Sequence, residues 1–346
     1  MTQPNDYAFD DAATVNKLLE TTGLQRILDL PGLTEVAVNQ PGEVWYDRGN
    51  GWEREDMPNL TLKQCMELAK ALATYARLPE RLNAENPVAS VILPNEERGQ
   101  IAIPPVTKSD VVSMTFRKPS MTRFSLSDYE QTGRFGQVQS RDASTTGLSA
   151  LQVQLLALKK SGRISEFFTM AVQNNLNILL VGGTGSGKTT VMKAMVDQFP
   201  AHKRIFTIED VHELTLPNHP NHLNLFYKQG GMTPKRLIES CMRMKPDHVL
   251  LAELRGDEAW SYLEMLNTGH EGSITTIHAN NCLSAPNRLA DLVKQSEVGK
   301  TLDYAHIMRT IRTSIDVVAF FRRTHLTELY YDPQLKNSLL SLEDHG

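Results

Sequence analysis

The hydrophobic and polar positions in the front of the chain predict a mixture of short strands and helices. Apolar and polar side chains alternate around Pro41-Gly42 and a second Gly-rich turn, which is typical of a β-meander. The predicted elements are a helix over 10–20, a meander over 34–55, a helix over 61–78, and three short strands within 89–105 and 111–118. Thr61 is the expected cap of the second helix. The front is therefore expected to be a small α+β domain.

The rear of the chain has a different pattern, in which continuous apolar runs alternate with amphipathic segments. The predicted strands are 177–183, 204–210, 248–254, 272–279 and 316–323, and the predicted helices include 150–162, 165–174, 233–244 and 257–269. Thr233 caps one of these helices and Pro234 takes its first position. Regular alternation of this kind indicates an α/β domain whose mostly parallel sheet is covered by helices on both faces.

Residues 121–149 separate the two patterns. They are polar, rich in Gly, Ser and Thr, and have no sustained period. This stretch is longer than most connections within a compact domain, so it is expected to be an interdomain linker. The predicted organisation is an N-terminal domain over 1–120, the linker, and a C-terminal domain over 150–346.

Composition and charge narrow the classes of protein that fit. A hydrophobic content of 40% with 22% charged residues is typical of a globular chain. Residues 1–120 carry 12 Lys and Arg against 17 Asp and Glu, and the remainder carries 24 against 23. An acidic front half is a poor partner for a phosphate backbone, so nucleic acid is not directly indicated as a ligand.

The start of the chain and its cysteines add two further expectations. The N-terminus has no basic start and no apolar stretch, and no run approaches the roughly 18 apolar residues that span a bilayer. Any membrane contact is therefore expected to be peripheral. Cys65, Cys241 and Cys282 are too widely spaced for a zinc site or a disulfide framework, so a cytoplasmic location and no zinc are expected.

A phosphate-binding loop is the most specific motif in the chain. The sequence GGTGSGKT directly follows an apolar strand and precedes an amphipathic helix, which is the context that this motif requires. Backbone N–H groups and the helix N-terminus would face the phosphates of ATP. Lys188 would reach the β- and γ-phosphates, and Thr189 would bind Mg²⁺ directly. The predicted nucleotide-binding residues are Gly182, Gly183, Thr184, Gly185, Ser186, Gly187, Lys188, Thr189 and Thr190.

With four motifs in order, the chain resembles the traffic ATPases of type IV secretion and conjugation systems. The motifs are the phosphate loop, RIFTIEDVHEL (204–214), RMKPDHVLLAELRGDEA (243–259) and TGHEGSITTIHAN (268–280). The resemblance extends forward to about residue 90, and the first 90 residues match more loosely. These ATPases belong to the secretion ATPase superfamily, which also contains type II secretion and type IV pilus motors. The resemblance implies a RecA-like fold for the C-terminal domain.

Acidic residues at the ends of two predicted strands complete the expected catalytic site. Parallel strands present their carboxyl ends at one edge of the sheet, so these acids should converge. The resemblance implies that Glu253, Glu209 and Asp210 hold Mg²⁺ through water, and that Glu253 polarises the attacking water. Asp210 has an alternative role as a helix cap, and Glu213 could be a surface acid.

Two histidines and several arginines have roles that come from the resemblance. It implies that His270 is a γ-phosphate sensor or a subunit-interface residue, and that His278 is a strut between its strand and the phosphate loop. Arg255 could brace a subunit interface or the glutamate network. Arg98 and Arg117 would meet the charge of the transition state from the front domain. Arg123 is a weaker candidate of the same kind.

The resulting hypothesis is a homo-hexameric ATPase at the cytoplasmic face of the inner membrane. It would couple Mg-ATP hydrolysis to substrate transfer or pilus assembly, together with inner-membrane components of a secretion or conjugation channel. The translocated substrate stays open. The alternatives are a type II secretion or type IV pilus motor, a DNA translocase or helicase, a small-molecule kinase, and an ATP-binding scaffold without turnover.

Overall fold

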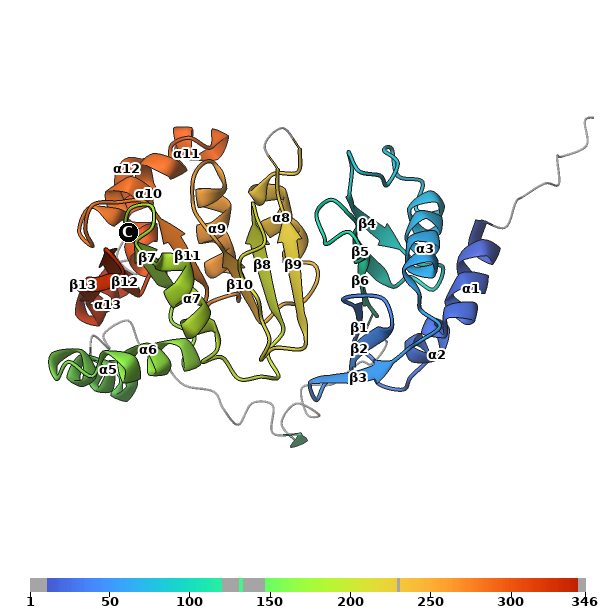
Figure 1. The fold of residues 1–346 in the computed structure, drawn as a ribbon, viewed down its shortest axis with the longest axis horizontal. Coiled ribbons are helices and arrows are strands. Elements are labelled where there is room, and N and C mark those ends of the chain that lie inside the picture. The colour runs from blue at the N-terminus through green and yellow to red at the C-terminus, as the bar shows by residue number, and fades with distance from the viewer. Residues whose placement is uncertain (1–10, 120–130, 133–146, 229–230, 342–346) are drawn as a thin grey trace, which may run out of the picture. The chain divides into compact units, whose positions relative to one another are not determined.

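The computed structural model describes residues 11–119, 131–132, 147–228 and 231–341. The chain divides into two compact units, Met1–Met121 with Leu223–Met232, and Thr122–His222 with Thr233–Gly346. Most of the linker expected at 121–149 lies outside the described residues, as does Arg123. Figure 1 shows the helices and strands of both units.

The front unit is built on a six-stranded sheet in the order β3-β2-β1-β6-β5-β4, and neighbouring strands in it are antiparallel. Its strands are β1 (Glu35–Val38), β2 (Glu43–Asp47), β3 (Trp52–Asp56), β4 (Val88–Ile92), β5 (Arg98–Ala102) and β6 (Ser113–Arg117). Its helices are α1 (Asp11–Thr22), α2 (Leu24–Leu28) and α3 (Leu62–Tyr75), and Figure 1 shows them together on one side of the sheet.

The second predicted helix of the front unit forms as expected, because its first turn is capped from both directions. The Thr61 hydroxyl accepts the backbone N–H of Gln64, and the Gln64 side chain accepts the N–H of Thr61. These bonds satisfy two donors that a helix start leaves free. Leu68 and Leu72 lie on the buried face, in a core with Val36 and Phe116 of the sheet. The front unit therefore has a hydrophobic core of its own.

The rear unit is built on a seven-stranded sheet in the order β13-β12-β7-β11-β10-β8-β9, although most residues of β9 fall within Leu223–Met232 of the other unit. Its strands are β7 (Ile178–Val181), β8 (Ile205–Glu209), β9 (His222–Phe226), β10 (His248–Leu251), β11 (Ile274–Ile277), β12 (Val317–Arg322) and β13 (His325–Tyr331). Strands β12, β7, β11, β10 and β8 pair in parallel, and β13 pairs antiparallel with β12. The expected α/β class with a mostly parallel sheet is confirmed.

Helices cover both faces of this sheet (Figure 1). They are α5 (Ala150–Lys160), α6 (Ile164–Gln173), α7 (Lys188–Val196), α8 (Pro234–Cys241), α9 (Glu258–Leu266), α10 (Ala285–Val293), α11 (Glu297–Thr301), α12 (Tyr304–Ser314) and α13 (Pro333–Ser341). Ile178 and Leu180 of β7 share a core with α5, α6 and α7. The alternate residues Leu179 and Val181 are also fully buried, so β7 is covered on both sides.

The two strands that the sequence pattern did not predict, β9 and β13, are the edge strands of the rear sheet. Strand β9 follows a Pro- and His-rich loop, and β13 carries charged or polar residues at most of its positions. Edge strands are buried on fewer sides, so their sequences lack the continuous apolar run that marks β7, β8 and β10. No helix in the part of the chain that the structure describes is long and apolar enough to cross a membrane.

The capping box of α3 gives a stability prediction. Thr61→Ala should lower the free energy of unfolding by about 1 kcal/mol, because the Gln64 N–H in the first turn loses the hydroxyl oxygen that accepts it. Amide hydrogen exchange of α3, measured by mass spectrometry, should speed up. The control is Thr74→Ala on the same helix, whose exposed hydroxyl only bonds back to the Lys70 carbonyl. An equal loss in both variants would contradict the role of the cap.

Candidate active site

The phosphate loop connects the buried strand β7 to α7 and is shaped by its glycines. A Cβ at Gly182 would lie 2.4 Å from the Phe321 carbonyl oxygen and 2.5 Å from Ser186 Oγ, so no side chain fits there. Gly187 has φ +83° at the N-cap of α7, in the left-handed region that favours glycine. Gly183, Thr184 and Gly185 are exposed. The loop therefore offers open backbone to a ligand while its two ends are held tightly.

Lys188 lies inside the loop rather than in solvent. Its side-chain amine donates to the backbone oxygens of Gly182, at 2.8 Å, and Gly183, at 2.9 Å. Burial lowers the pKa of the Lys188 amine, and the negative charge of Glu253 opposes that shift. The amine is thus already positioned at the loop and within the electrostatic influence of the carboxylate at the end of β10.

The remaining polar groups of the loop fit a bound phosphate and its metal. Ser186 Oγ is buried and has no hydrogen-bond partner among the described residues, and a phosphate oxygen would supply the missing acceptor. Thr189 is half-buried in the first turn of α7, and Thr190 is exposed. No three His, Cys, Asp or Glu side chains meet as a ready-made metal site in the described ranges. A divalent ion here would depend on Thr189, water and substrate phosphates, as Mg²⁺ usually does.

Four side chains that follow β8, β10 and β11 form one connected network. Arg255 donates from Nη1 to Asp210 Oδ2 and from Nη2 to Glu253 Oε2, both at 2.7 Å. On the other side, His278 Nε2 lies 3.0 Å from Glu253 Oε1. Glu253 is mostly buried, whereas Asp210 and Arg255 are exposed. The three strands are parallel, so the network lies at the edge of the sheet that also carries the phosphate loop.

This network refines several of the expected roles. Glu253 follows β10 by two residues instead of ending the strand, which closes at Leu251. Arg255 braces Glu253, which was one of its two expected roles. His278 is paired with Glu253 and not with an atom of the phosphate loop, although His278 and the loop line the same cavity. The helix-cap alternative for Asp210 is wrong, because no helix follows it.

Glu209 has a different environment from Asp210, although the two are adjacent. It is completely buried, and its Oε2 accepts the backbone N–H groups of Glu213 and Leu214, both at 2.8 Å. Its Oε1 accepts the Thr207 hydroxyl at 2.7 Å. Both oxygens are therefore occupied in holding the segment after β8. A role in binding metal through water stays a prediction, and it would require these bonds to rearrange.

The structure separates His270 from the phosphate loop of its own chain. His270 precedes β11, and β11 runs parallel to β7 with Ile274 opposite Ile178. His270 therefore belongs to the amino edge of the sheet, whereas the phosphate loop and His278 belong to the carboxyl edge. Burial lowers the pKa of the His270 imidazole. A γ-phosphate sensor in its own subunit does not fit this placement, and the subunit-interface role stays a prediction.

Arg98 and Arg117 lie side by side in the front unit. They are directly opposite each other on the neighbouring strands β5 and β6, and both are exposed. Glu35 of β1 stands opposite Arg117, with 3.6 Å between Arg117 Nε and Glu35 Oε1. Like charges directly opposite in a sheet are destabilising. Repulsion between the two guanidinium groups therefore destabilises this pair, and a bound anion would reduce the repulsion.

A large open cavity adjoins the phosphate loop within the rear unit. It has a volume of about 1010 Å³. Its walls come from the loop, the segment after β11, α10, and the turn between β12 and β13. The cationic side chains that line it are Arg288, Arg322 and Arg323, which the sequence motifs did not single out. They follow no recognised motif, and only the strand order, with β12 next to β7, brings the last two to the loop.

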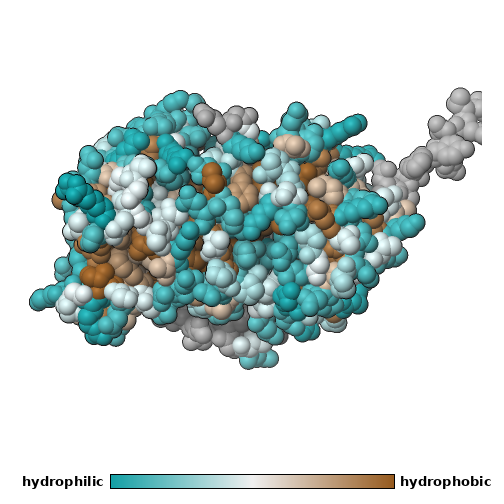
Figure 2. Space-filling view, in the orientation of Figure 1, coloured by the Kyte–Doolittle hydropathy of each residue, from teal (hydrophilic) through white to brown (hydrophobic). Residues whose placement is uncertain are grey.

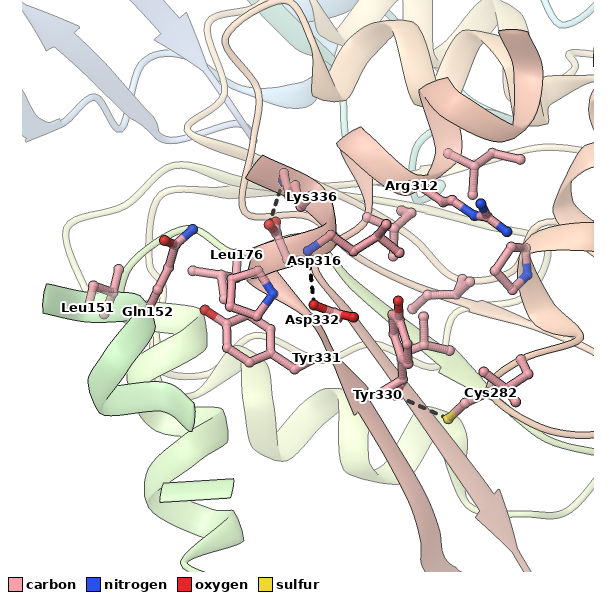
Figure 3. Close-up of a pocket in the computed structure, with 18 of the residues that line it drawn as sticks. Leu151, Gln152, Leu176, Cys282, Arg312, Asp316, Tyr330, Tyr331, Asp332 and Lys336 are labelled. Atoms are coloured by element: carbon pink, nitrogen blue, oxygen red, sulfur yellow. Dashed lines mark hydrogen bonds and ion pairs between the residues drawn. The ribbon is translucent and has the colours of Figure 1, made fainter. Parts of the chain in front are cut away.

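A second, smaller cavity of about 270 Å³ lies near the beginning of β12 (Figure 3). Apolar side chains from α5, α12 and β12 form much of its wall, and Figure 2 shows hydrophobic surface near β13 and α13. Three of its charged groups are occupied within the protein, whereas Arg312 is exposed. Asp316 binds Lys336, at 2.5 Å, and the Asn177 N–H, while Asp332 accepts the Leu335 N–H. Among the described residues that line it, Arg312 is the exposed cation, and the glycine-rich backbone that surrounds phosphates in the loop is missing.

Comparisons with known proteins agree with this geometry. Residues 138–327 match the family model described as Type II/IV secretion system protein. The chain is 41% identical over 350 residues to the type IV secretion system protein VirB11 of Brucella suis, which covers 97% of this chain and 95% of that protein. The chain belongs to the VirB11 family of type IV secretion ATPases.

A second relative and a solved structure match almost as completely. The type IV secretion system protein PtlH of Bordetella pertussis is 34% identical over 330 residues, with 92% of this chain and 93% of that protein covered. The crystal structure of the Brucella suis VirB11 ATPase in complex with sulphate superposes with a TM-score of 0.88 at 43% identity. It covers 95% of this chain and 98% of that one. The expected family and the ATPase class are therefore confirmed.

The contrast between Glu209 and Asp210 gives a prediction for this site. Glu209→Gln should lower the free energy of unfolding by about 2 kcal/mol, because the amide cannot accept from all three donors. Asp210→Asn removes an exposed ion pair and should cost less than about 1 kcal/mol. It should still lower ATP turnover about tenfold, because Arg255 loses one of its two anchors.

Thermal melting and phosphate-release assays on both variants check this pair of expectations. The opposite pattern, with Asp210→Asn unstable and Glu209→Gln stable, would show that the two carboxylates have been assigned the wrong roles.

Proposed function

We propose that this ATPase hydrolyses Mg-ATP at the phosphate loop and works as a homo-hexamer in a type IV secretion system. The observation that carries the proposal is the placement of Lys188 and the Asp210–Arg255–Glu253–His278 network at one edge of the sheet. A nucleotide held by the loop would have its terminal phosphate toward these side chains. Binding, charge compensation and orientation of water are what phosphoryl transfer requires of a protein.

Each residue has a distinct task in this proposal. Lys188 would exchange its bonds to the loop carbonyls for bonds to the β- and γ-phosphates, and Thr189 would bind Mg²⁺. Mg²⁺ would neutralise phosphate charge. Glu253 would orient the attacking water, because Arg255 and His278 fix its carboxylate from two sides. Asp210 and, after rearrangement, Glu209 would accept hydrogen bonds from metal-bound water.

Arg98 and Arg117 would complete the site from the front domain. The guanidinium group of Arg255 is already bound to Asp210 and Glu253. It is therefore not available to the transferred phosphate. The two adjacent arginines of β5 and β6 have the geometry to bind such an anion together. Closure of the front domain on the nucleotide, and its release after hydrolysis, would then convert chemistry into movement.

The wider setting also belongs to the proposal. The family relationship supports a place at the cytoplasmic face of the inner membrane, with channel components as partners. Movement of the front domains would drive substrate transfer or pilus assembly. The domain borders proposed for this movement are 1–120 and 150–346, with the linker over 121–149 as the hinge region.

Lys188→Ala tests the site assignment directly. ATP turnover should fall at least about a hundredfold, because the cation that reaches the phosphates is lost. Steady-state phosphate release is the measurement, and Lys193→Ala on the same helix is the control for the loss of one lysine. Turnover near that of the unchanged protein would show that nucleotide chemistry happens elsewhere.

Arg98→Ala and Arg117→Ala test the front-domain arginines. Each should reduce kcat by about a hundredfold or more and change ADP affinity much less, because the charge they meet develops during transfer. Arg48→Ala, an exposed arginine of the same domain paired with Glu53, is the control. If both variants lose ADP binding and thermal stability together, the two residues have a structural role instead.

A further inference from the structure

The turn between β12 and β13 has an unusual composition for its shape. Arg322 pairs with His325, so the turn consists of Arg323 and Thr324 alone. Both residues have positive φ, at +48° and +67°. Two-residue turns of this kind normally contain Asn and Gly, because bulky and β-branched residues are strained there. An arginine and a threonine stand where local conformation favours neither, and such backbone strain is common at functional sites.

This turn packs directly on the phosphate loop. A Cβ at Gly187 would meet three Thr324 atoms, at 3.5, 3.6 and 3.6 Å, and the Phe321 carbonyl faces Gly182 at the start of the loop. The Thr324 hydroxyl donates to the Arg323 backbone oxygen, which is also 2.7 Å from His325 Nδ1. The conformation of the turn is therefore fixed by its own hydrogen bonds and by contact with the loop.

The side chains of this turn bring free positive charge to the cavity beside the loop. Arg322 and Arg323 both line it and are exposed. Neither guanidinium has an ion-pair or hydrogen-bond partner in the described part of the chain. The acids in the lining are Asp291 and Glu328, and one Glu328 oxygen accepts the Cys282 N–H. Two free guanidinium groups are thus presented next to a phosphate-binding loop.

The strand order sets the end of the nucleotide that these arginines can reach. Strand β12 lies on one side of β7, and β11, β10 and β8 lie on the other. The acids and His278 follow the strands of the second side, where the terminal phosphate and its metal belong. A triphosphate that runs along the loop would have its opposite, nucleoside-linked end toward β12.

We propose that Arg322 and Arg323 bind the nucleoside-proximal phosphates of the nucleotide and thereby set its ground-state affinity. The proposal rests on the proposed nucleotide site. The two arginine pairs have different roles in it. The turn arginines bind ATP and ADP equally in the ground state, whereas Arg98 and Arg117 stabilise the transition state. An interaction made equally in both states changes KM more than kcat.

The first experiment compares the full-length chain with the double variant Arg322→Gln/Arg323→Gln. Isothermal titration with ATP, ADP and inorganic tripolyphosphate should show each affinity reduced by at least about tenfold, the usual effect of losing a hydrogen bond to a charged group. The KM for ATP should rise by a larger factor than kcat falls. Arg312→Gln, which removes an exposed arginine from the other cavity, is the control and should bind all three normally.

A second variant separates charge from the shape of the turn. Arg323→Asn/Thr324→Gly installs residues that a two-residue turn prefers, so thermal stability should stay equal or rise while ATP affinity falls. A purely structural role of the turn predicts that affinity follows stability instead.

Each remaining outcome decides the proposal. Unchanged affinities in both variants would overturn it, and so would a loss confined to ATP, which would place the arginines at the γ-phosphate. A loss for ATP and ADP but not for tripolyphosphate would also overturn it, because the contact would then be to the nucleoside. If the unchanged protein, like Lys188→Ala, binds no nucleotide, the proposed function itself fails, which is a different result from normal binding by the arginine variants.

Discussion

The parallel register of β12, β7, β11, β10 and β8 is the constraint on which the site depends. Each of these strands ends at the same edge, so residues far apart in the sequence meet there without any local motif. Lys188, Asp210, Glu253 and His278 all follow strands of this set. Strand β7 is buried on both faces, so tight packing against its neighbours holds these strand ends in place.

The sequence predicted what depends on local chemistry and on long apolar runs. The Thr61 cap, the phosphate loop and the buried parallel strands each have a signal that stands within a few residues. The acids after β8 and β10 could be named for the same reason, together with the family resemblance. The sequence pattern missed β9 and β13, whose edge positions do not require a continuous apolar run.

The sequence could not show how similar residues close together in the chain differ in their surroundings, because that difference depends on packing. Glu209 and Asp210 are adjacent acids, yet one is enclosed by backbone donors and the other is exposed beside Arg255. His270 and His278 belong to one motif but lie before and after the same short strand, at opposite edges of the sheet. Arg322 and Arg323 gain their position only because β12 lies next to β7.

The contact between Gly182 and the Phe321 carbonyl has a consequence for how the protein is made. Gly182 belongs to the loop itself, whereas Phe321 belongs to a strand near the end of the rear unit. The loop therefore takes its shape only when that strand is in place. During synthesis, β12 must leave the ribosome before the loop can reach its final shape. A nascent chain that ends before β12 lacks the Phe321 carbonyl that packs on Gly182, so its phosphate loop would be incomplete.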